Sequence, residues 1–391
     1  MADLPPVVDR LTATPPWRAR LAWKLAAAAL PPLVLVGAAC GVWLRVGEFV
    51  TAAQAVQAQS SDRQVLFGQA YSNRTRAYKW HAVRLRRPEV LALGSSRVLQ
   101  FRSEAFSSRF FNAGGNADCL EDLGAFLFDL PEDARPAQVI VGLDQWWFNG
   151  TYTAPGCRSD QATESPALSA FTGAWLDTWW DALAGKFTLA DVLAAPRIDG
   201  ESRIGLNAWL NRNGFRNDGS YLYGGIIGDP ENPAKNADYR FLGTIARIRA
   251  GAARFTPGRS VDVRRVSVFR EFLRQCRARR IHVTAFLPPF PRAVLNEMHG
   301  FRGRFEYMEA LPSRLGRVAA EEGVFLGDMT DLAVLGFSDL EAIDGYHCSE
   351  KAYLAVLIRL AQSDPTLASH VNDPQALADR LAHARGRFVV F

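Results

Sequence analysis

Hydrophobic residues in the first part of the chain after residue 88 gather in three short runs, with helical spacing between them. The runs are bounded by glycine or polar residues and lie at 90–93, 110–113 and 138–143. Apolar runs of this length are typical of buried strands, whereas 98 onward and 120–130 repeat their hydrophobic residues with a helical period. Strand and helix alternate at short spacing, so we predict a parallel sheet covered by helices on both faces.

The same alternation returns after residue 257. We expect, in order, a helix, a strand, a helix, a strand and a helix, at 261–280, 281–287, 304–321, 323–326 and 350–362. The first of these helices has a clear amphipathic stripe. Residues 88–391 are therefore predicted to form one α/β domain.

The alternation breaks down between 146 and 257, where tryptophan is frequent. The six tryptophans of this segment are Trp146, Trp147, Trp175, Trp179, Trp180 and Trp209. Long segments of this kind inside a compact domain are usually binding elements or lids, so we interpret 146–257 as an insertion over the site. Its tryptophans could stack on sugar rings, or they could equally form a small core of the insertion itself.

Residues 25–44 contain no charged residue and are long enough, at about 20 residues, to cross a bilayer once. Trp23 and Trp43 bracket the run like interfacial anchors. The basic residues of 1–24 precede it, which places the N-terminus in the cytoplasm. A cleaved signal peptide or a lipoprotein signal ending at Cys40 are the alternatives, but the apolar run continues past Cys40 and favours an uncleaved transmembrane helix. The polar segment 45–87 is interpreted as a stalk or linker.

Composition narrows the class of protein further. Hydrophobic residues make up 48% and charged residues 22% of the 391 residues, as in globular proteins. The net charge is +5, of which residues 1–24 contribute +2, and the remainder of the chain is close to balanced, so a nucleic-acid partner is not implied. No zinc-ligand spacing occurs, and no metal is predicted. Four cysteines follow the anchor; we expect Cys119 to pair with Cys157, because both flank the same strand, with two free buried cysteines as the alternative.

Candidate chemistry gathers just past the ends of the predicted strands. Ser96, Gly114 and the pair Asp144/Gln145 each follow a successive strand, and ligand sites of parallel sheets form at this edge. Serines at such a turn can simply cap the following helix. Asp344 lies three residues before His347 at a turn that enters a helix, a spacing that lets the carboxylate orient Nδ1 and leaves Nε2 free to take a serine proton.

Three segments together resemble the motif blocks of the SGNH (GDSL-like) hydrolase superfamily. They are Gly94-Ser95-Ser96, Asn112-Ala113-Gly114 and Asp344-Gly345-Tyr346-His347. The resemblance covers roughly 89–144 and 344–362 and implies a flavodoxin-like three-layer α/β/α sandwich. It implies Ser96 as the nucleophile, with His347 and Asp344 as its triad partners. It also implies that the backbone N–H groups of Gly114 and Ser96 stabilise the oxyanion.

One block departs from the family pattern. Gly142-Leu143-Asp144-Gln145 stands where the superfamily usually has Gly-x-Asn-Asp. An ionised aspartate cannot donate a hydrogen bond, so we assign the side-chain oxyanion donor to Gln145. Arg97, Asp144, Trp146 and Trp147 are the candidate substrate-binding residues, although an arginine beside a carboxylate is commonly structural.

The Gly-Ser-Ser-Arg turn, the Asp-Gln-Trp-Trp-Phe run and the N-terminal anchor resemble the membrane-tethered extracytoplasmic branch of this superfamily. That branch includes proteins of alginate O-acetylation and teichoic-acid D-alanylation. The resemblance implies acyl transfer or ester hydrolysis on an exported or cell-envelope polysaccharide, without a cofactor and beside a membrane-embedded O-acyltransferase. It also implies a bacterial inner-membrane protein whose C-terminal domain is periplasmic.

Two other functions are compatible with the sequence. The chain could be a non-catalytic glycan-binding or assembly subunit of a polysaccharide export or modification complex, as the replacement at Gln145 suggests. It could also hydrolyse lipid esters at the membrane surface. Transfer and hydrolysis share an acyl-serine intermediate, so the sequence leaves both open.

Overall fold

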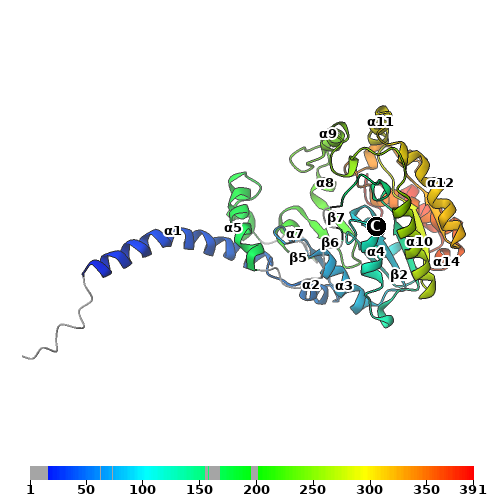
Figure 1. Ribbon diagram of the computed structural model, residues 1–391. Helices are drawn as coiled ribbons and strands as arrows, with labels where there is room; N and C mark the ends of the chain where they lie inside the picture. Colours follow the sequence, from blue (N-terminus) through cyan, green and yellow to red (C-terminus); the bar gives the residue numbers. More distant parts are fainter. Residues whose placement is uncertain (1–15, 62, 73, 155–156, 158–167, 195–200) are drawn as a thin grey trace, which may run out of the picture.

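A long N-terminal helix projects from a body that contains two sheets (Figure 1). The computed structural model describes residues 16–391 except 62, 73, 155–156, 158–167 and 195–200. The N-terminal helix is α1 (Pro16–Val46), and the C-terminus lies within the body.

The main sheet has five parallel strands. They are β2 (Val90–Gly94), β3 (Phe110–Gly114), β4 (Gln138–Gly142), β8 (His282–Leu287) and β9 (Phe325–Asp328). Their spatial order is β3-β2-β4-β8-β9, which is 2-1-3-4-5 when these strands are numbered along the chain. This is one of the two common orders of doubly wound sheets. The prediction of an α/β domain with a parallel sheet is therefore confirmed.

Successive residues of the central strands pack into two different cores. Leu91 and Leu93 contact one core, whereas Val90 and Ala92 contact the other, because side chains alternate across a strand. The first core is completed by α3 (Thr75–Arg86), α4 (Leu120–Leu127), α10 (Val263–Ala278), α11 (Arg292–Gly300) and α12 (Glu306–Glu321). The second is completed by α13 (Glu350–Ser363), α14 (Pro365–Ala368) and α15 (Pro374–His383). Helices thus cover both faces of the sheet.

A second, smaller sheet joins the segment before the domain to the insertion. Its order is β5-β1-β6-β7, from the strands β1 (Gln64–Phe67), β5 (Glu201–Ile204), β6 (Asn213–Phe215) and β7 (Tyr221–Tyr223). The remaining helices are α2 (Ala52–Ala58), α5 (Leu168–Leu183), α6 (Leu189–Leu193), α7 (Leu206–Asn211), α8 (Gly224–Gly228) and α9 (Leu242–Ala250).

Residues 45–87 are not a stalk, contrary to our interpretation. β1 pairs with β5 and β6, and α3 packs on the main sheet with Tyr78 and Lys79 fully buried. Lys79 donates hydrogen bonds to the carbonyl oxygens of Asn112 and Gly219, which lie in the main domain and the insertion. The polar composition of this segment hides these contacts, because only short stretches of it, such as Val65, Leu66 and Phe67 of β1, are apolar and buried.

The disulfide expected from the sequence is present between Cys119 and Cys157. Cys276 and Cys348 are buried free thiols, and Cys40 in α1 is also free. The bridge ties the start of α4 to the segment that begins the insertion.

By length and composition, α1 could cross a membrane. The uncharged run 25–44 lies inside it, and Pro31 and Pro32 continue the helix. Residues 1–15 of the predicted cytoplasmic segment lie outside the described part of the chain. We expected Trp43 to lie at the membrane interface as an anchor. Instead its side chain is buried against α5, and its indole N–H donates to Thr178 at 3.0 Å.

Candidate active site

The two serines in the turn after β2 make different contacts. Ser95 precedes a short 3-10 helix (Ser96–Val98), and its hydroxyl accepts a hydrogen bond from the Arg97 N–H at 3.2 Å. Ser95 therefore supplies the cap that we had considered for both residues. Ser96 is only partly buried, and its hydroxyl is left to interact elsewhere.

Close packing of two strand ends holds this turn in place. An added Cβ at Gly114 or Gly142 would lie 2.5 Å or 2.3 Å from a methyl group of Val98, which follows the serine turn. Only glycine allows the turn to approach the ends of β3 and β4 so closely. The side chain of Asn112 adds to this, because its amide donates to the carbonyl oxygens of Val98 and Phe101.

Ser96, His347 and Asp344 form one hydrogen-bonded chain. His347 Nε2 lies 2.9 Å from Ser96 Oγ, and His347 Nδ1 lies 2.7 Å from Asp344 Oδ2. Asp344 Oδ1 also accepts the backbone N–H groups of Tyr346 and His347, both at 2.8 Å. The carboxylate is thus fixed and orients the imidazole toward the serine, which is the arrangement of a nucleophile, base and orienting acid.

The insertion holds the loop that carries Asp344 and His347. Asp238 accepts the Gly345 N–H at 2.9 Å, and Asn236 donates to the Ile343 carbonyl at 3.0 Å. A Cβ at Gly345 would lie 2.4 Å from the hydroxyl of Thr244, so the insertion packs directly on the loop. Segment 146–257 therefore supports the candidate site from the side, a role that no sequence pattern indicated because these partners lie about 100 residues apart.

Tyr223 of the insertion also contacts the candidate base. Its ring centroid lies 5.4 Å from that of the His347 imidazole. Burial raises the pKa of the Tyr223 hydroxyl well above its ordinary value, so the group stays neutral. Tyr223 was not among the predicted site residues, since a tyrosine in a short aromatic strand is ordinarily part of a core.

We predicted that Arg97 binds substrate, but the structure shows it to be a structural residue. It is buried, and all five of its N–H donors have partners in the protein. The acceptors are the carbonyl oxygens of Tyr346, Pro288 and Pro289 and the side chains of Asp144 and Gln145. It links the serine turn to the ends of β4 and β8 and to the histidine loop.

Gln145 and Asp144 are likewise turned into the protein. The Gln145 amide donates to the Pro288 carbonyl at 2.9 Å and to Thr330 Oγ1 at 3.3 Å, so it is not available as the oxyanion donor that we assigned. Asp144 is buried beside Arg97 and cannot contact a substrate. Burial raises the pKa of Asp144, although Arg97 lies next to it.

The predicted oxyanion donors differ in their availability. The Gly114 N–H donates to Asn112 Oδ1 at 2.9 Å and is engaged in this conformation. Within the described residues, the Ser96 N–H has no protein acceptor. Of the three groups expected to line an oxyanion hole, the structure leaves the Ser96 N–H free.

Trp146 and Trp147 are buried and do not offer a glycan-stacking surface, contrary to our prediction. Trp146 packs edge-on against Tyr346, with ring centroids 6.0 Å apart, and lies beside the Arg97 guanidinium. Tryptophans that follow a strand end were expected at the site opening. The short 3-10 helix that they enter instead turns both rings into the core.

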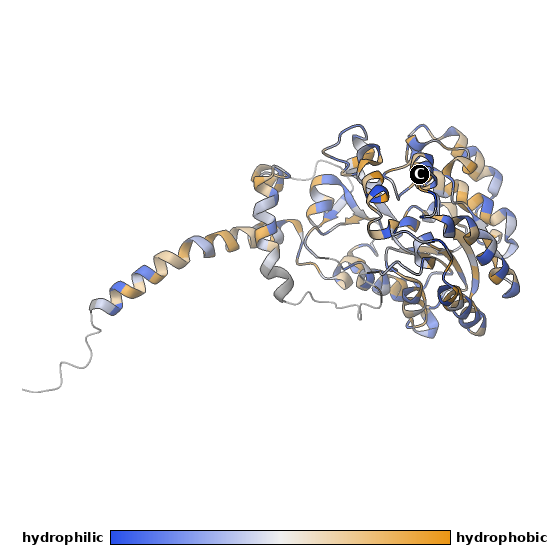
Figure 2. Cartoon of the chain, turned by 45° about the horizontal axis from the view of Figure 1, so that its top comes forward, coloured by the Kyte–Doolittle hydropathy of each residue, from blue (hydrophilic) through white to orange (hydrophobic). Residues whose placement is uncertain are grey.

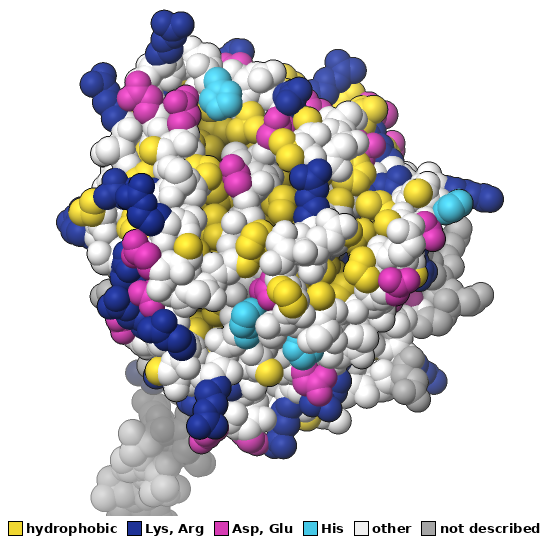
Figure 3. Space-filling view, turned by 90° about the vertical axis from the view of Figure 1, so that its right-hand side faces the viewer, with side chains coloured by type: hydrophobic (Ala, Val, Ile, Leu, Met, Phe, Trp, Pro, Cys, Tyr) yellow, Lys and Arg dark blue, Asp and Glu magenta, His cyan; other side chains and the backbone are white. Residues whose placement is uncertain are grey.

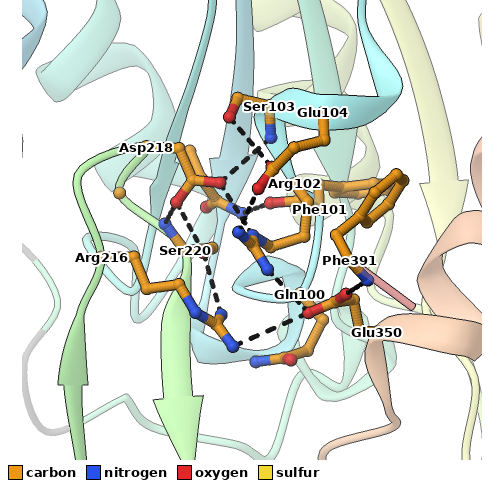
Figure 4. A network of polar contacts seen from close by, with 12 residues as sticks. Gln100, Phe101, Arg102, Ser103, Glu104, Arg216, Asp218, Ser220, Glu350 and Phe391 are labelled. Carbon is orange, nitrogen blue, oxygen red and sulfur yellow. Dashed lines mark hydrogen bonds and ion pairs between the residues drawn. The ribbon is translucent and has the colours of Figure 1, made fainter. Parts of the chain in front are cut away.

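A buried ionic network joins the segment after the serine turn to the insertion and to α13 (Figure 4). Arg102 donates to Asp218 of the insertion and to Glu350 of α13, both at 2.9 Å. The other Glu350 oxygen accepts the backbone N–H of Phe391, the last residue, at 2.8 Å. Burial alone would raise the pKa of Asp218, but Arg102 and Arg216 outweigh it and lower the pKa. Asp218 is therefore ionised, and the network ties the segment after the serine turn to the insertion and to α13.

One group of potential metal ligands occurs in the described parts of the chain: Cys119, Glu121 and Cys157. The two sulfur atoms are joined in the disulfide and are not thiolate ligands. With both sulfur atoms in the disulfide, this group keeps only the Glu121 carboxylate as a possible ligand.

The pH dependence of stability is expected to report on Asp344. Burial alone would raise its pKa, but His347 and the two backbone N–H groups lower it below the ordinary value. The ionised carboxylate therefore stabilises the fold above the unfolded pKa of about 3.9, and this contribution is lost as the pH falls through the lower folded pKa. We expect Asp344→Asn to reduce the melting temperature at pH 7 and to approach the wild type near pH 3.

Thermal melts of the wild type and Asp344→Asn between pH 7 and pH 3 measure this difference. Asp133→Asn is the matched control, because Asp133 forms an exposed ion pair with Arg87. Its difference from the wild type is expected to stay small across the range. A deficit for Asp344→Asn that is constant down to pH 3 contradicts the assignment.

No protein-family model, curated protein or solved structure matches the chain. Its function therefore has to be inferred from the geometry of these side chains.

Proposed function

We propose that this protein is a membrane-anchored serine O-acyltransferase or acylesterase of the SGNH type that acts on an exported or cell-envelope polysaccharide. The observation that carries the proposal is the hydrogen-bonded chain from Ser96 Oγ through His347 to Asp344, with distances of 2.9 and 2.7 Å. Its position past the carboxyl ends of a parallel sheet, behind an apolar N-terminal helix, supports the same function.

The proposed reaction begins with attack of Ser96 Oγ on the ester carbonyl carbon, while His347 Nε2 takes the hydroxyl proton. The Ser96 N–H stabilises the negative oxygen of the tetrahedral intermediate. The ester bond then breaks, and His347 returns the proton to the leaving alcohol. Asp344 keeps the proton of His347 on Nδ1 and stabilises the imidazolium that forms.

The resulting acyl-serine is resolved by the reverse sequence. His347 deprotonates an acceptor hydroxyl, which attacks the acyl carbonyl and releases Ser96. A sugar hydroxyl as acceptor gives transfer, and water gives hydrolysis. Every proton in these steps is exchanged by His347, so the reaction requires no cofactor. The acetyl group, the polysaccharide, the periplasmic location and a membrane-embedded O-acyltransferase as partner follow from the family resemblance and belong to the same proposal.

A second candidate function is that of a non-catalytic glycan-binding or assembly subunit. The observation that favours it is the occupied state of two expected oxyanion donors, Gly114 N–H and Gln145 Nε2. Loss of one such donor costs about 10²- to 10³-fold in rate in other serine hydrolases. The catalytic function requires the Gly114 N–H to leave Asn112 when substrate binds, or the Ser96 N–H to suffice.

Covalent labelling with a serine-directed fluorophosphonate, followed by intact-mass analysis and peptide mapping, separates the two. The full chain in detergent is compared with Ser96→Ala and with the matched neighbour Ser95→Ala. We expect one adduct on Ser96 in the wild type and in Ser95→Ala, and none in Ser96→Ala. A folded wild-type protein that takes up no label, and that leaves an activated acetyl ester intact, supports the non-catalytic function instead.

A further inference from the structure

The insertion helix α5 lies across α1 at the end of α1 that joins the body (Figure 1). The contact is specific: the Trp43 indole donates to Thr178, and the Trp179 indole donates to the Leu35 carbonyl at 3.1 Å. Val42, Trp43 and Val46 of α1 share a small core with Ala174 of α5 and Val192 of α6. The position of α5 along α1 is therefore fixed.

This position conflicts with α5 lying in water if α1 crosses a bilayer. The uncharged run 25–44 rises about 30 Å along a helix, which matches the hydrocarbon core of a bilayer. The hydrogen bonds between α5 and α1 are made at Leu35 and Trp43, in the last part of that run. If α5 were outside the membrane, only residues 25–34 would remain inside it, about 15 Å or half of the hydrocarbon core.

The side chains of α5 are divided between two faces in the manner of a helix at a membrane surface. Trp180 and Leu183 are 68% and 78% exposed, and Leu176 belongs to the same apolar stripe at spacings of four and three residues. Asp181 on the opposite side accepts a hydrogen bond from Tyr71 of the body at 3.1 Å. The polar side of α5 thus faces the body, and its apolar side is uncovered.

The short helix α6 extends the uncovered apolar surface. Leu189 and Leu193 are exposed, at 57% and 71%, while Val192 between them is buried against the core shared with α1. Hydrophobic residues mark both the middle of α1 and the part of the insertion next to it (Figure 2). On the face of the body opposite α1, hydrophobic side chains lie mainly in the middle, and charged side chains of both signs lie mainly toward the edges (Figure 3).

We propose that α5 and α6 are embedded in the leaflet of the bilayer next to the body and form a second membrane contact beside α1. The surface consists of Leu176, Trp180, Leu183, Leu189 and Leu193, and its partner is lipid. Tryptophan and leucine on one face with polar groups on the other is the pattern of helices that lie in the interfacial plane. The proposal rests on α1 crossing the membrane, and it is independent of the chemistry of Ser96.

Two attached elements fix the orientation of the body, whereas a single helix joined by a flexible stalk lets it rotate. With α5 and α6 in the leaflet, the small sheet and the insertion lie nearest the membrane. The Asp344 loop, which the insertion holds through Asp238 and Asn236, is thereby kept at a set height above the lipid. A polymer-modifying site held in this way stays beside any membrane-embedded source of acyl groups.

The test uses the full chain in phosphatidylcholine vesicles with an environment-sensitive nitrobenzoxadiazole label on single cysteines. Cys40→Ala removes the one free cysteine among the described residues that is not buried. In that background, Leu183→Cys probes α5, Leu33→Cys probes the exposed middle of α1, and Leu340→Cys probes an exposed leucine of the body. Each protein is measured with and without lipids that have a doxyl quencher on the acyl chain.

We expect the label at Leu183 to lose most of its fluorescence to doxyl lipid, as the label at Leu33 does, while the label at Leu340 keeps it. Quenching at Leu33 without quenching at Leu183 overturns the proposal and leaves the α1 anchor intact. No quenching at either position removes the anchor as well. A label at Leu183 that becomes shielded only when other membrane proteins are added shows that the surface binds protein, which also overturns the proposal.

Discussion

Replacing Ser96 with alanine is expected to lower kcat for aryl-ester hydrolysis by about 10⁶-fold, the size of effect seen when a triad serine is removed from other hydrolases. The Ser96 hydroxyl is the group that would attack the ester, and the methyl side chain of alanine has no nucleophilic atom to replace it. Because Ser96 is partly exposed and its side chain has one hydrogen-bond partner, stability should change by about 1 kcal/mol or less. Steady-state kinetics and a thermal melt of the same preparation measure both quantities.

The neighbouring serine supplies the control for this result. Ser95→Ala removes a helix cap, at a cost of about 1 kcal/mol, but keeps the nucleophile. It should retain most of the activity. If Ser95→Ala and Ser96→Ala are equally impaired, the turn matters only as structure and Ser96 is not the nucleophile.

His347→Ala tests whether the three side chains act as one unit. Residues of a triad depend on each other, so the loss in His347→Ala should nearly equal that in Ser96→Ala, and the double variant should be no worse than either. Losses that multiply in the double variant would indicate two independent functions, and the proposed proton transfer between Ser96 Oγ and His347 Nε2 would be wrong.

Replacing Arg97 with methionine is expected to lower the free energy of unfolding by about 3–5 kcal/mol, the range for breaking a buried ion pair from one side. The change leaves Asp144 buried without its cation, and it removes the donors of the Pro288, Pro289 and Tyr346 carbonyl groups. The deficit should shrink as the pH falls, because protonation neutralises the buried Asp144 carboxylate. Denaturant unfolding at several pH values measures it.

Arg97→Lys and Arg264→Met complete this experiment. Lysine restores the charge but not the five-donor fork, so it should recover only part of the stability. Arg264 is an exposed residue with a surface ion pair, and its replacement should cost about 0.5 kcal/mol or less. An Arg97→Met protein as stable as Arg264→Met, with a raised KM, would return Arg97 to the role of a substrate-binding residue.

The strands of the main sheet could be predicted because they are buried on both faces. A parallel strand covered by helices is apolar at nearly every position, so β2, β4 and β8 appear as mainly hydrophobic runs. Strand β1 has the same burial at three of its four residues. It is too short and too close to polar residues to be recognised, and its partners β5 and β6 lie more than 130 residues away.

The proximity of Ser96, Asp344 and His347 was also predicted: the strand-end rule placed Ser96 at the edge of the sheet, and the three-residue spacing of Asp344 and His347, together with the family resemblance, added the other two. The roles of residues next to them were not. Position after a strand end says that a side chain is near the edge of the sheet, but not whether it points outward or back beneath the turn. Arg97, Gln145, Trp146 and Trp147 all point inward, because the two short 3-10 helices after β2 and β4 rotate these side chains into the core.

By itself, the sequence determined the strands of the main sheet, the apolar N-terminal helix and the residue types that the site requires, since each depends on local hydrophobic patterns and short motifs. Tertiary structure alone decided how those parts are held. The insertion supports the Asp344 loop through Asp238, Arg97 joins three segments beneath the serine, and α5 packs on α1 through Trp43 and Thr178. The hydrogen bonds from Asp238 to Gly345, from Arg97 to Tyr346 and from Trp43 to Thr178 each join residues more than 100 positions apart, and such pairings leave no periodic trace in a sequence.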